Sequence, residues 1–267
     1  MIQQQAIIRF STRIAPDCYH LGIACEGELL KAVPGQFVMV QVGDRNTPLL
    51  RRPFSISGFM GGPGQADGIE LLVKVVGPGT RRLTRMGVGQ AVNLLGPLGH
   101  GFRLGANDKD IYLAAGGIGV APIRFLAADL MAKGFHSERC RLFLGGRSHT
   151  DLLCRKDFEE LGISVTATTD DGSDGDQCLV TDPLEIAIQA RRPDIICACG
   201  PHGMLACIAG IAERHRIRCQ LSIETMMACG MGVCLGCAVE SRKQQETYMH
   251  ACIHGPVFNV EDLKLTL

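Results

Sequence analysis

Four cysteines near the C-terminus are spaced C-x4-C-x2-C-x14-C, and this spacing constrains the fold more than any other feature of the sequence. They are Cys229, Cys234, Cys237 and Cys252. The segment around them has little apolar periodicity, so it offers few side chains for a hydrophobic core of its own. Glycines separate the first three cysteines, at Gly230, Gly232 and Gly236. Backbone without side chains can wrap closely around an inorganic group and direct N–H groups at sulfur.

The first three cysteines have the spacing with which plant-type ferredoxins hold a [2Fe–2S] cluster. We therefore expect all four thiolates to ligate such a cluster. Two alternatives stay open from the residues alone. A structural zinc site more often uses two C-x2-C pairs, and unliganded cysteines pack as small hydrophobic side chains. The chain has 13 cysteines, and we expect no chemistry from those outside the cluster motif, with the exception of Cys199.

The charge balance argues against nucleic acid and anionic membranes as partners. Lys and Arg number 27, Asp and Glu also number 27, and the net charge is zero. The longest apolar stretch, residues 111–123, is broken by glycines and a proline and is too short to span a bilayer. The N-terminal residues do not form a secretory signal. We expect a cytoplasmic protein, in which cysteines stay reduced unless they bind metal.

The first hundred residues are rich in Gly and Pro and contain short runs of β-type residues. These runs are residues 5–11, 37–42, 55–59, 70–76 and 91–95. Turn-forming residues separate the runs, as at Val33-Pro34-Gly35 and Gly77-Pro78-Gly79. Short strands at such spacing predict a small antiparallel β-barrel.

From Asp110 the pattern changes to alternating strands and helices. The apolar run 111–115 is followed by a glycine turn, an apolar-periodic segment at 121–133 and a strand-like run at 141–144. This βαβ order predicts a parallel sheet. Further strands are expected at 164–168 and 194–198, and further helices at 183–189 and 203–215. The fold class is therefore multidomain, α/β plus β, with expected domains 1–103, 104–220 and 221–267.

Two segments of the expected barrel suit a phosphorylated ring cofactor. Arg52-Pro53-Phe54-Ser55 begins a strand, and it pairs a guanidinium for a phosphate with a hydroxyl for a ring nitrogen. Leu72-Val73-Lys74 leads into Gly77-Pro78-Gly79-Thr80, where we expect Thr80 to be the N-cap of a helix whose N-terminus receives pyrophosphate. A solvated arginine and a plain capped surface helix are the alternatives for the two segments in isolation.

The expected parallel sheet has nucleotide-binding signals at the carboxyl ends of its strands. The turn Gly116-Gly117-Ile118-Gly119 follows a strand and precedes a helix, so phosphate can approach bare backbone there. Cys199-Gly200-Pro201 and Asp170-Asp171-Gly172-Ser173 end two other strands at the edge where open α/β sheets bind ligands. A tight turn without a ligand and a solvated loop are the corresponding alternatives.

In this order, the motifs resemble the ferredoxin–NADP reductase superfamily. The order is R-P-F-S, G-x-G-T, G-P-L-G-x-G-F at residues 96–102, G-G-I-G-x-x-P, T-D-D-G-S at residues 169–173, and C-G-P. With the cysteine segment 224–237 and the run C-I-H-G-P-V-F at 252–258, the whole chain is similar to the electron transfer subunits of type B dihydroorotate dehydrogenase. One departure is His254, which stands where that family usually has an acidic residue.

The resemblance implies an FAD-binding barrel, a nicotinamide-nucleotide domain and a small [2Fe–2S] domain. It implies that FAD is held by Arg52, Pro53, Phe54, Ser55, Leu72, Val73, Lys74, Gly79 and Thr80. It implies that NAD is held by Gly116, Gly117, Gly119, Cys199, Gly200 and Pro201. Ser55, facing the flavin ring, and Cys199, close to the nicotinamide, are then the expected catalytic residues, and the four motif cysteines hold the cluster.

The function that the resemblance implies is an electron relay in pyrimidine biosynthesis. Electrons would pass between the FMN of a dihydroorotate dehydrogenase catalytic subunit and NAD⁺, through the [2Fe–2S] cluster and FAD, in a heterotetramer with two copies of each subunit. The FAD would convert between the hydride of a nicotinamide and the single electrons of a cluster.

Three questions stay open from the sequence. The same cofactors would suit a subunit of a sulfide dehydrogenase or a bifurcating transhydrogenase. A regulatory module with zinc at the cysteines is a hypothesis from another class. The loop after the second strand of the nucleotide domain contains Arg147, which could meet the 2′-phosphate of NADP, although the family favours NAD.

Overall fold

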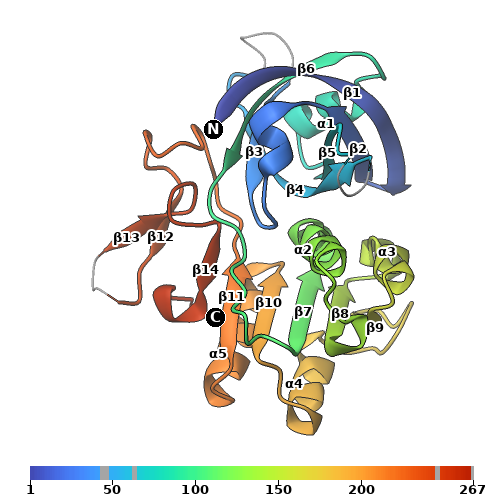
Figure 1. Cartoon of the computed structure of the whole chain (residues 1–267), viewed down its shortest axis with the longest axis vertical. Coiled ribbons are helices and arrows are strands. Elements are labelled where there is room, and N and C mark those ends of the chain that lie inside the picture. Colours follow the sequence, from blue (N-terminus) through green and yellow to red (C-terminus); the bar gives the residue numbers. More distant parts are fainter. Residues whose placement is uncertain (43–47, 62–64, 244–246, 266–267) are drawn as a thin grey trace.

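The structure is a computed structural model that describes residues 1–42, 48–61, 65–243 and 247–265. In Figure 1 a barrel lies above a parallel sheet, and the C-terminal segment lies beside both. The barrel strands are β1 (Ile2–Ala15), β2 (Cys18–Ala24), β3 (Phe37–Gln41), β4 (Arg52–Met60), β5 (Gly68–Lys74) and β6 (Ala91–Leu98). They close in the order β1-β2-β5-β4-β3-β6 with antiparallel neighbours. The predicted antiparallel barrel is confirmed.

Two short helices belong to the barrel half, the 3-10 helix Gly27–Lys31 and α1 (Pro78–Arg85). The expectation that Thr80 caps α1 is wrong, because the N-cap is Gly77 and proline follows it at the first helical position. The Thr80 hydroxyl reaches back to this turn. It accepts hydrogen bonds from the N–H groups of Val76 (3.0 Å) and Gly77 (3.2 Å). Thr80 therefore holds the turn before the helix in place.

The second half of the chain is a six-stranded sheet with helices on both faces. Its strands are β7 (Ile111–Gly116), β8 (Cys140–Gly146), β9 (Ser164–Thr169), β10 (Ile195–Cys199), β11 (Arg218–Ser222) and β14 (Val257–Asn259), in the order β14-β11-β10-β7-β8-β9. Its helices are α2 (Val120–Ala132), α3 (Arg155–Glu160), α4 (Thr181–Ala190) and α5 (His202–Arg214), with 3-10 turns at Gly117–Gly119, Ser137–Arg139 and His149–Asp151. All strand pairs except β11 with β14 are parallel, as predicted.

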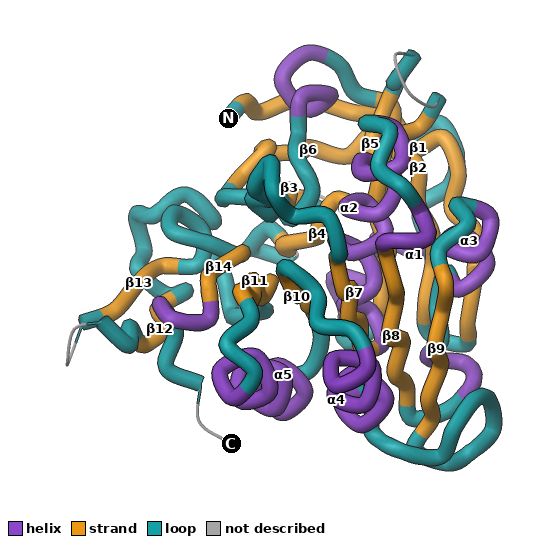
Figure 2. The backbone as a smooth tube through the Cα atoms, turned by 60° about the horizontal axis from the view of Figure 1, so that its bottom comes forward, coloured by secondary structure: helices purple, strands orange, loops and turns teal. Residues whose placement is uncertain are grey.

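The side chains of β7 alternate between the two faces of this sheet. Ile111, Leu113 and Ala115 belong to the core under α2 and α3, while Tyr112 and Ala114 belong to the core over α4 and α5. Figure 2 shows the two helix pairs on opposite sides of the strands. A strand covered on both faces has to be apolar at every position, which is why this strand could be predicted from its sequence.

The sequence did not predict β2 and β11, nor the short strands of the C-terminal segment, β14 among them. In β11, the polar residues Arg218, Gln220 and Ser222 alternate with apolar ones, and the strand is short. It runs across the expected domain boundary between residues 220 and 221. The strand β14, from the C-terminal segment, then pairs with β11. The C-terminal segment is therefore joined to the six-stranded sheet by backbone hydrogen bonds.

The C-terminal segment also packs against the barrel. It contains the antiparallel pair β12 (Ala238–Glu240) and β13 (Tyr248–His250) and the 3-10 helix Val260–Asp262. Its core combines Cys237, Cys252 and Phe258 with side chains of β3 and β6, among them Met39 and Leu98. The segment thus touches both halves of the protein. None of the helices in the described ranges has the length and apolar character needed to cross a membrane.

Candidate functional site

A cavity of about 420 Å³ opens where β4 faces the second half of the protein. It is lined by most of the residues expected to hold FAD, namely Arg52, Pro53, Phe54, Ser55, Leu72, Lys74 and Thr80. Val73 does not line it, because its side chain is fully buried in the barrel core. Gly79 lies beside it, against Arg52. We call this space the flavin cavity.

The start of α1 and the Arg52 side chain form one end of the flavin cavity. A Cβ atom on Gly79 would lie 3.1 Å from Nε of Arg52, so the backbone of this turn lies directly against the guanidinium. Arg52 Nη1 donates a hydrogen bond of 2.6 Å to the carbonyl of Leu50, which orients the side chain. A cation beside backbone N–H groups at a helix start is a suitable site for a diphosphate. These residues therefore fit the diphosphate of FAD.

A second cavity, of about 800 Å³, lies at the carboxyl ends of the parallel strands. Five of the residues expected to hold NAD line it: Gly116, Gly117, Gly119, Gly200 and Pro201. A Cβ atom on Gly119 would lie 2.5 Å from the carbonyl oxygen of Cys199, so only glycine lets the turn before α2 approach the end of β10 this closely. This edge of an open α/β sheet is where nucleotides bind. We call this space the nucleotide cavity.

Cys199 does not line the nucleotide cavity. Its side chain is 2% exposed and contacts the hydroxyl of Ser222 on the neighbouring strand. Burial raises the pKa of the Cys199 thiol to about 12. The group is therefore a neutral thiol at physiological pH, and its expected place beside the nicotinamide stays a prediction.

From the sequence, Arg147 was a candidate for binding the 2′-phosphate of NADP. In the structure its side chain pairs with the carboxylate of Asp151. Arg147 Nε lies 2.9 Å from Oδ2 of Asp151, and Lys74 Nζ lies 3.5 Å from Oδ1 of the same residue. Burial raises the pKa of Asp151, but the hydrogen bond from Arg147 and the charge of Lys74 outweigh it, and the pKa lies below its ordinary value. Asp151 therefore offsets the positive charge of Arg147 at the edge of the nucleotide cavity.

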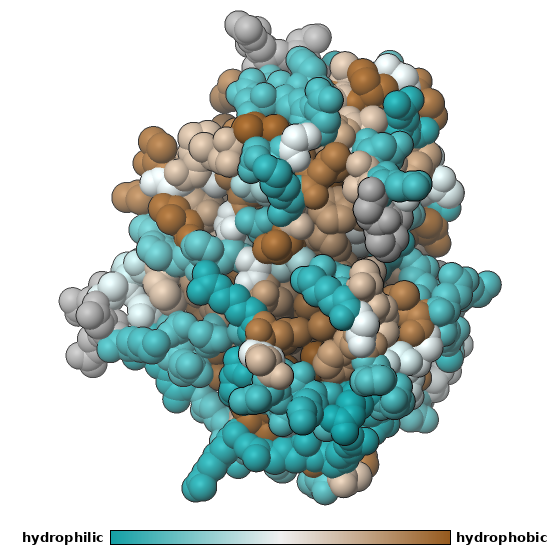
Figure 3. All heavy atoms as spheres, viewed as in Figure 1, coloured by the Kyte–Doolittle hydropathy of each residue, from teal (hydrophilic) through white to brown (hydrophobic). Residues whose placement is uncertain are grey.

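The flavin cavity and the nucleotide cavity share part of their walls, at Lys74, Ile118 and Glu224. Figure 3 shows a hollow with a largely hydrophobic floor between the two halves of the molecule. Sequence reasoning assigned no role to Glu224. Its position two residues after the last parallel strand could not be predicted, because β11 was not expected. The loss of water contacts in the hollow raises the pKa of Glu224, against the opposing charge of Lys74.

Residues 223–265, which we call the cluster segment, form the third side of the flavin cavity. Ile223, Thr225, Met227 and Pro256 line the cavity opposite the barrel residues. Two residues after Met227 comes the first motif cysteine, Cys229. The chain therefore leads from the wall of the flavin cavity directly into the cysteine motif.

The geometry around Cys229 suits a thiolate ligand. The N–H groups of Met231 and Cys234 each lie 3.4 Å from its sulfur. Burial raises the pKa of Cys229, but these N–H groups outweigh it and bring the pKa to about 6. Gly230 has a φ of +72°, and a Cβ atom on it would lie 2.5 Å from Cγ of Met39. Only glycine permits this turn, as the sequence predicted.

The other motif cysteines lie at different depths. Cys237 and Cys252 are buried with their sulfur atoms 3.2 Å apart, and Cys234 is exposed. Within the described residues, no three Cys, His, Asp or Glu side chains are arranged around one metal ion. The two irons of a [2Fe–2S] cluster take two cysteines each, whereas a structural zinc ion takes four ligands at one point. The choice between these two groups therefore rests on the cysteine spacing.

Family models match three consecutive stretches of the chain. The oxidoreductase FAD-binding domain matches residues 5–102. The oxidoreductase NAD-binding domain matches residues 113–210. The iron-sulfur cluster binding domain of dihydroorotate dehydrogenase B matches residues 224–264. The chain thus has FAD-, NAD- and cluster-binding domains in the expected order.

Similar proteins cover nearly the whole chain. The dihydroorotate dehydrogenase B (NAD(+)) electron transfer subunit of Desulforamulus reducens is 37% identical over 248 residues, which are 92% of this chain and 92% of the relative. The subunit of the same name from Caldanaerobacter subterraneus subsp. tengcongensis is 34% identical over 262 residues, 98% of each chain.

Among solved structures, the NADH-dependent reduced ferredoxin-NADP oxidoreductase, described in connection with flavin-based electron bifurcation, matches with a TM-score of 0.83. It is 27% identical, over 97% of this chain and 90% of that chain. The curated relatives have the higher identity, over a comparable share of the chain. By its sequence identity to them over nearly its full length, the chain belongs to the family of dihydroorotate dehydrogenase B (NAD(+)) electron transfer subunits.

Proposed function

We propose that this chain relays electrons between the FMN of a dihydroorotate dehydrogenase catalytic subunit and NAD⁺, through a [2Fe–2S] cluster and FAD. The observation that carries the proposal is the shared wall of the two cavities. Lys74, Ile118 and Glu224 line both of them, and the cluster segment lines the flavin cavity from another side. A nicotinamide, a flavin and a cluster bound in these places would lie next to one another. Electron transfer between them requires such proximity.

The residues of the chain bind and orient the groups. When bound, FAD joins the two-electron chemistry of a nicotinamide to the one-electron chemistry of a cluster. Ser55 lines the flavin cavity beside Phe54 and carries the hydroxyl that we assign to the flavin ring. The glycine turn before α2 would offer its backbone N–H groups to the phosphates of a bound nucleotide. Glu224 and Lys74 stand where the two rings would meet, and Ile118 gives that place an apolar wall.

The surface around the cluster motif supports a protein partner. Cys234 is exposed, and exposed apolar side chains lie on both sides of it in the sequence, Val233 at 77% and Leu235 at 56%. Met226, before the motif, is 86% exposed. Exposed apolar residues gathered at one place mark protein interaction sites. A catalytic subunit that covers this loop would bring its own redox group close to the cluster.

The remaining parts of the proposal concern organisation. We assign FAD to residues 1–103, NAD to residues 104–220 and the cluster to residues 221–267. We expect two copies of each subunit in the complex and a cytoplasmic location. The catalytic Cys199 and the set of residues named for FAD and NAD also belong to this proposal.

A second function is a subunit of a bifurcating transhydrogenase type of complex. The observation that favours it is the match to the NADH-dependent reduced ferredoxin-NADP oxidoreductase, with a TM-score of 0.83. That enzyme is less similar to this chain in sequence than the curated relatives are. The partner subunit therefore discriminates between the two functions.

The deciding experiment is an anaerobic visible spectrum of the purified chain, with iron, sulfide and flavin analysis, before and after addition of NADH. We expect flavin, two iron and two sulfide per chain, and bleaching by NADH. Adding a dihydroorotate dehydrogenase catalytic subunit with dihydroorotate should then reduce NAD⁺. Zinc without flavin would overturn the whole proposal. A chain that NADH bleaches but that forms no complex with that subunit would overturn the choice of partner.

A further inference from the structure

Helix α2 belongs to both halves of the protein. The glycine turn of the nucleotide cavity stands at its N-terminus, and one flank of the helix packs against strand β4 of the barrel. Phe125 of α2 is buried in the barrel core, and its ring meets that of Phe59 of β4 edge to face, with centroids 5.0 Å apart. The position of α2 therefore sets where the nucleotide cavity lies relative to β4.

Arg124, next to Phe125, makes polar contacts across the same boundary. Its Nη1 donates to Oε2 of Glu70 on β5 at 2.6 Å and to the carbonyl of Ser57 on β4 at 3.0 Å. Its Nε donates to Asp157 on α3. The Arg124 guanidinium thus connects the barrel strands β4 and β5 with the helices α2 and α3 of the second half of the chain, which we call the nucleotide half. The side chains of Arg124 and Glu70 are only 20% and 14% exposed, so water screens this contact little.

The barrel is built to receive this guanidinium. On β4, Ile56 pairs with Leu71 of β5 and Gly58 pairs with Glu70, so Ser57 is an extra residue in a β-bulge. The bulge frees the Ser57 carbonyl for Arg124. A Cβ atom on Gly58 would lie 2.9 Å from Nη1 of Arg124, so a larger residue would push the guanidinium away. The bulge at Ser57, the glycine Gly58 and the carboxylate of Glu70 together form a site for the Arg124 side chain, which we call the socket.

The socket lies two residues along β4 from the expected flavin contact Ser55, and Arg124 lies five residues after Gly119 of the nucleotide turn. We propose that Arg124 is a positioning residue, which holds the nucleotide cavity in register with the flavin cavity and so sets the approach of the nicotinamide to the flavin. This inference rests on the proposed function. Hydride transfer is sensitive to such register, because a misplacement of about 1 Å can slow a reaction about a hundredfold.

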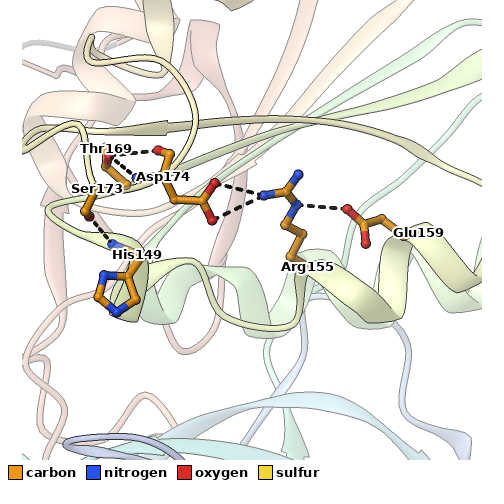
Figure 4. A network of polar contacts seen from close by, with 6 residues as sticks. All are labelled: His149, Arg155, Glu159, Thr169, Ser173 and Asp174. Atoms are coloured by element: carbon orange, nitrogen blue, oxygen red, sulfur yellow. Dashed lines mark hydrogen bonds and ion pairs between the residues drawn. The ribbon is translucent and has the colours of Figure 1, made fainter.

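The chain offers a matched control in Arg155. Figure 4 shows Arg155 between Glu159 of α3 and Asp174 of the loop after β9. Its Nε lies 2.8 Å from Glu159 and its Nη1 lies 3.2 Å from Asp174. Arg155 therefore bridges two carboxylates as Arg124 does, but both partners belong to the nucleotide half. It lines neither the flavin cavity nor the nucleotide cavity.

The test compares Arg124→Lys with Arg155→Lys in the full chain, purified anaerobically with its cofactors. Lysine keeps the charge but cannot serve three acceptors with a planar fork. The measurements are the single-turnover rate of FAD reduction by NADH, the dissociation constant for NADH, the FAD content and amide hydrogen exchange at residues 56–60 and 120–126. The long-wavelength charge-transfer absorbance of the flavin with the nicotinamide gives a readout that does not depend on turnover.

We expect Arg124→Lys to lower the FAD reduction rate by about tenfold to about a hundredfold and to weaken the charge-transfer absorbance. FAD content should stay unchanged, the dissociation constant for NADH should change less than about threefold, and exchange should accelerate at both segments. Arg155→Lys should match the unsubstituted chain. A merely structural role of Arg124 would instead lower FAD content or stability and leave the rate per bound flavin unchanged, which would overturn the inference.

If Arg124→Lys does not fold, Glu70→Gln provides the second variant. It keeps the shape of the socket and removes one charge, so we expect the same effects to a smaller degree, and an unchanged rate would contradict the inference. Failure of the proposed function looks different, because NADH would then not reduce the flavin of the unsubstituted chain.

Discussion

The sulfur atoms of Cys237 and Cys252 lie 3.2 Å apart in the core that the cluster segment shares with the barrel. The two residues are 1% and 4% exposed, while Cys234 of the same motif is exposed. The motif therefore has a buried side, held by tertiary packing, and an open side that faces solvent. The two sides should respond differently to loss of the cluster.

We predict that a disulfide forms between Cys237 and Cys252 when iron is removed by a chelator in the presence of the thiol oxidant diamide. Their sulfur atoms are already close, so little backbone movement is needed. Peptide mapping by mass spectrometry should find this pair, with the loss of two hydrogen atoms. The variant Cys237→Ser is the control and should lack it. A dominant disulfide of Cys229 with Cys234 would contradict the geometry.

Replacement of Cys234 by serine should abolish the cluster but not the flavin reaction. The substitution removes one of four thiolate ligands at the exposed end of the motif, away from both cavities. We expect loss of the cluster absorbance and of electron transfer to the partner, with the rate of FAD reduction by NADH largely intact. Cys178→Ser, outside the motif, serves as control. Retention of full cluster absorbance in Cys234→Ser would refute its role as a ligand.

Substitution of Gly230 by alanine should destabilise the cluster segment. Its φ of +72° disfavours any side chain, and the added Cβ would meet Met39 at 2.5 Å. We expect a loss of about 1–3 kcal/mol in the free energy of unfolding, measured by denaturant titration. In Gly210→Ala, within α5, the new Cβ has ordinary contacts only, and stability should rise by about 0.5–1 kcal/mol. Equal effects of the two substitutions would contradict this account.

Arg147→Ala should leave the use of NADH nearly unchanged. The Arg147 side chain donates to Asp151 through Nε, and NADH has no 2′-phosphate that this guanidinium could bind. We expect the kcat/KM for NADH to change less than about threefold and that for NADPH to stay low. A collapse of NADPH activity with unchanged NADH kinetics would show that the chain prefers NADP.

The thiol of Cys199 should not titrate in the working pH range. Burial raises its pKa to about 12, so the neutral form predominates at all lower pH values. We expect the pH profile of FAD reduction between pH 6 and pH 10 to have the same shape in Cys199→Ala as in the unsubstituted chain, whatever the change in rate. An inflection near pH 8.5, the ordinary thiol range, that disappears in the variant would show that Cys199 is an exposed, ionising group.

The local sequence was enough to predict a feature of the structure wherever its residue types allow only one structural role. Strand β7 is apolar at every position because both its faces are covered, so it could be predicted without knowing its neighbours. The cysteine spacing and the glycine at residue 230 indicated a closely wrapped inorganic group, because thiolate ligation and positive φ admit few alternatives. The antiparallel barrel and the parallel sheet followed from periodicity in the same way.

Tertiary structure decided what depends on partners distant in the sequence. Strand β11 is half polar and becomes a strand because β10 and β14 pair with it. That pairing places Glu224 in the wall of both cavities. Thr80 is not the N-cap, because α1 already begins at Pro78, and its hydroxyl instead accepts the N–H of the N-cap Gly77. In the local sequence, Arg124 is a charged residue at the end of an apolar run. The packing of α2 on the β4 bulge gives its guanidinium three hydrogen-bond acceptors. Residue type and spacing therefore determined which groups the chain can bind, and the packing of its halves determined how those groups face one another.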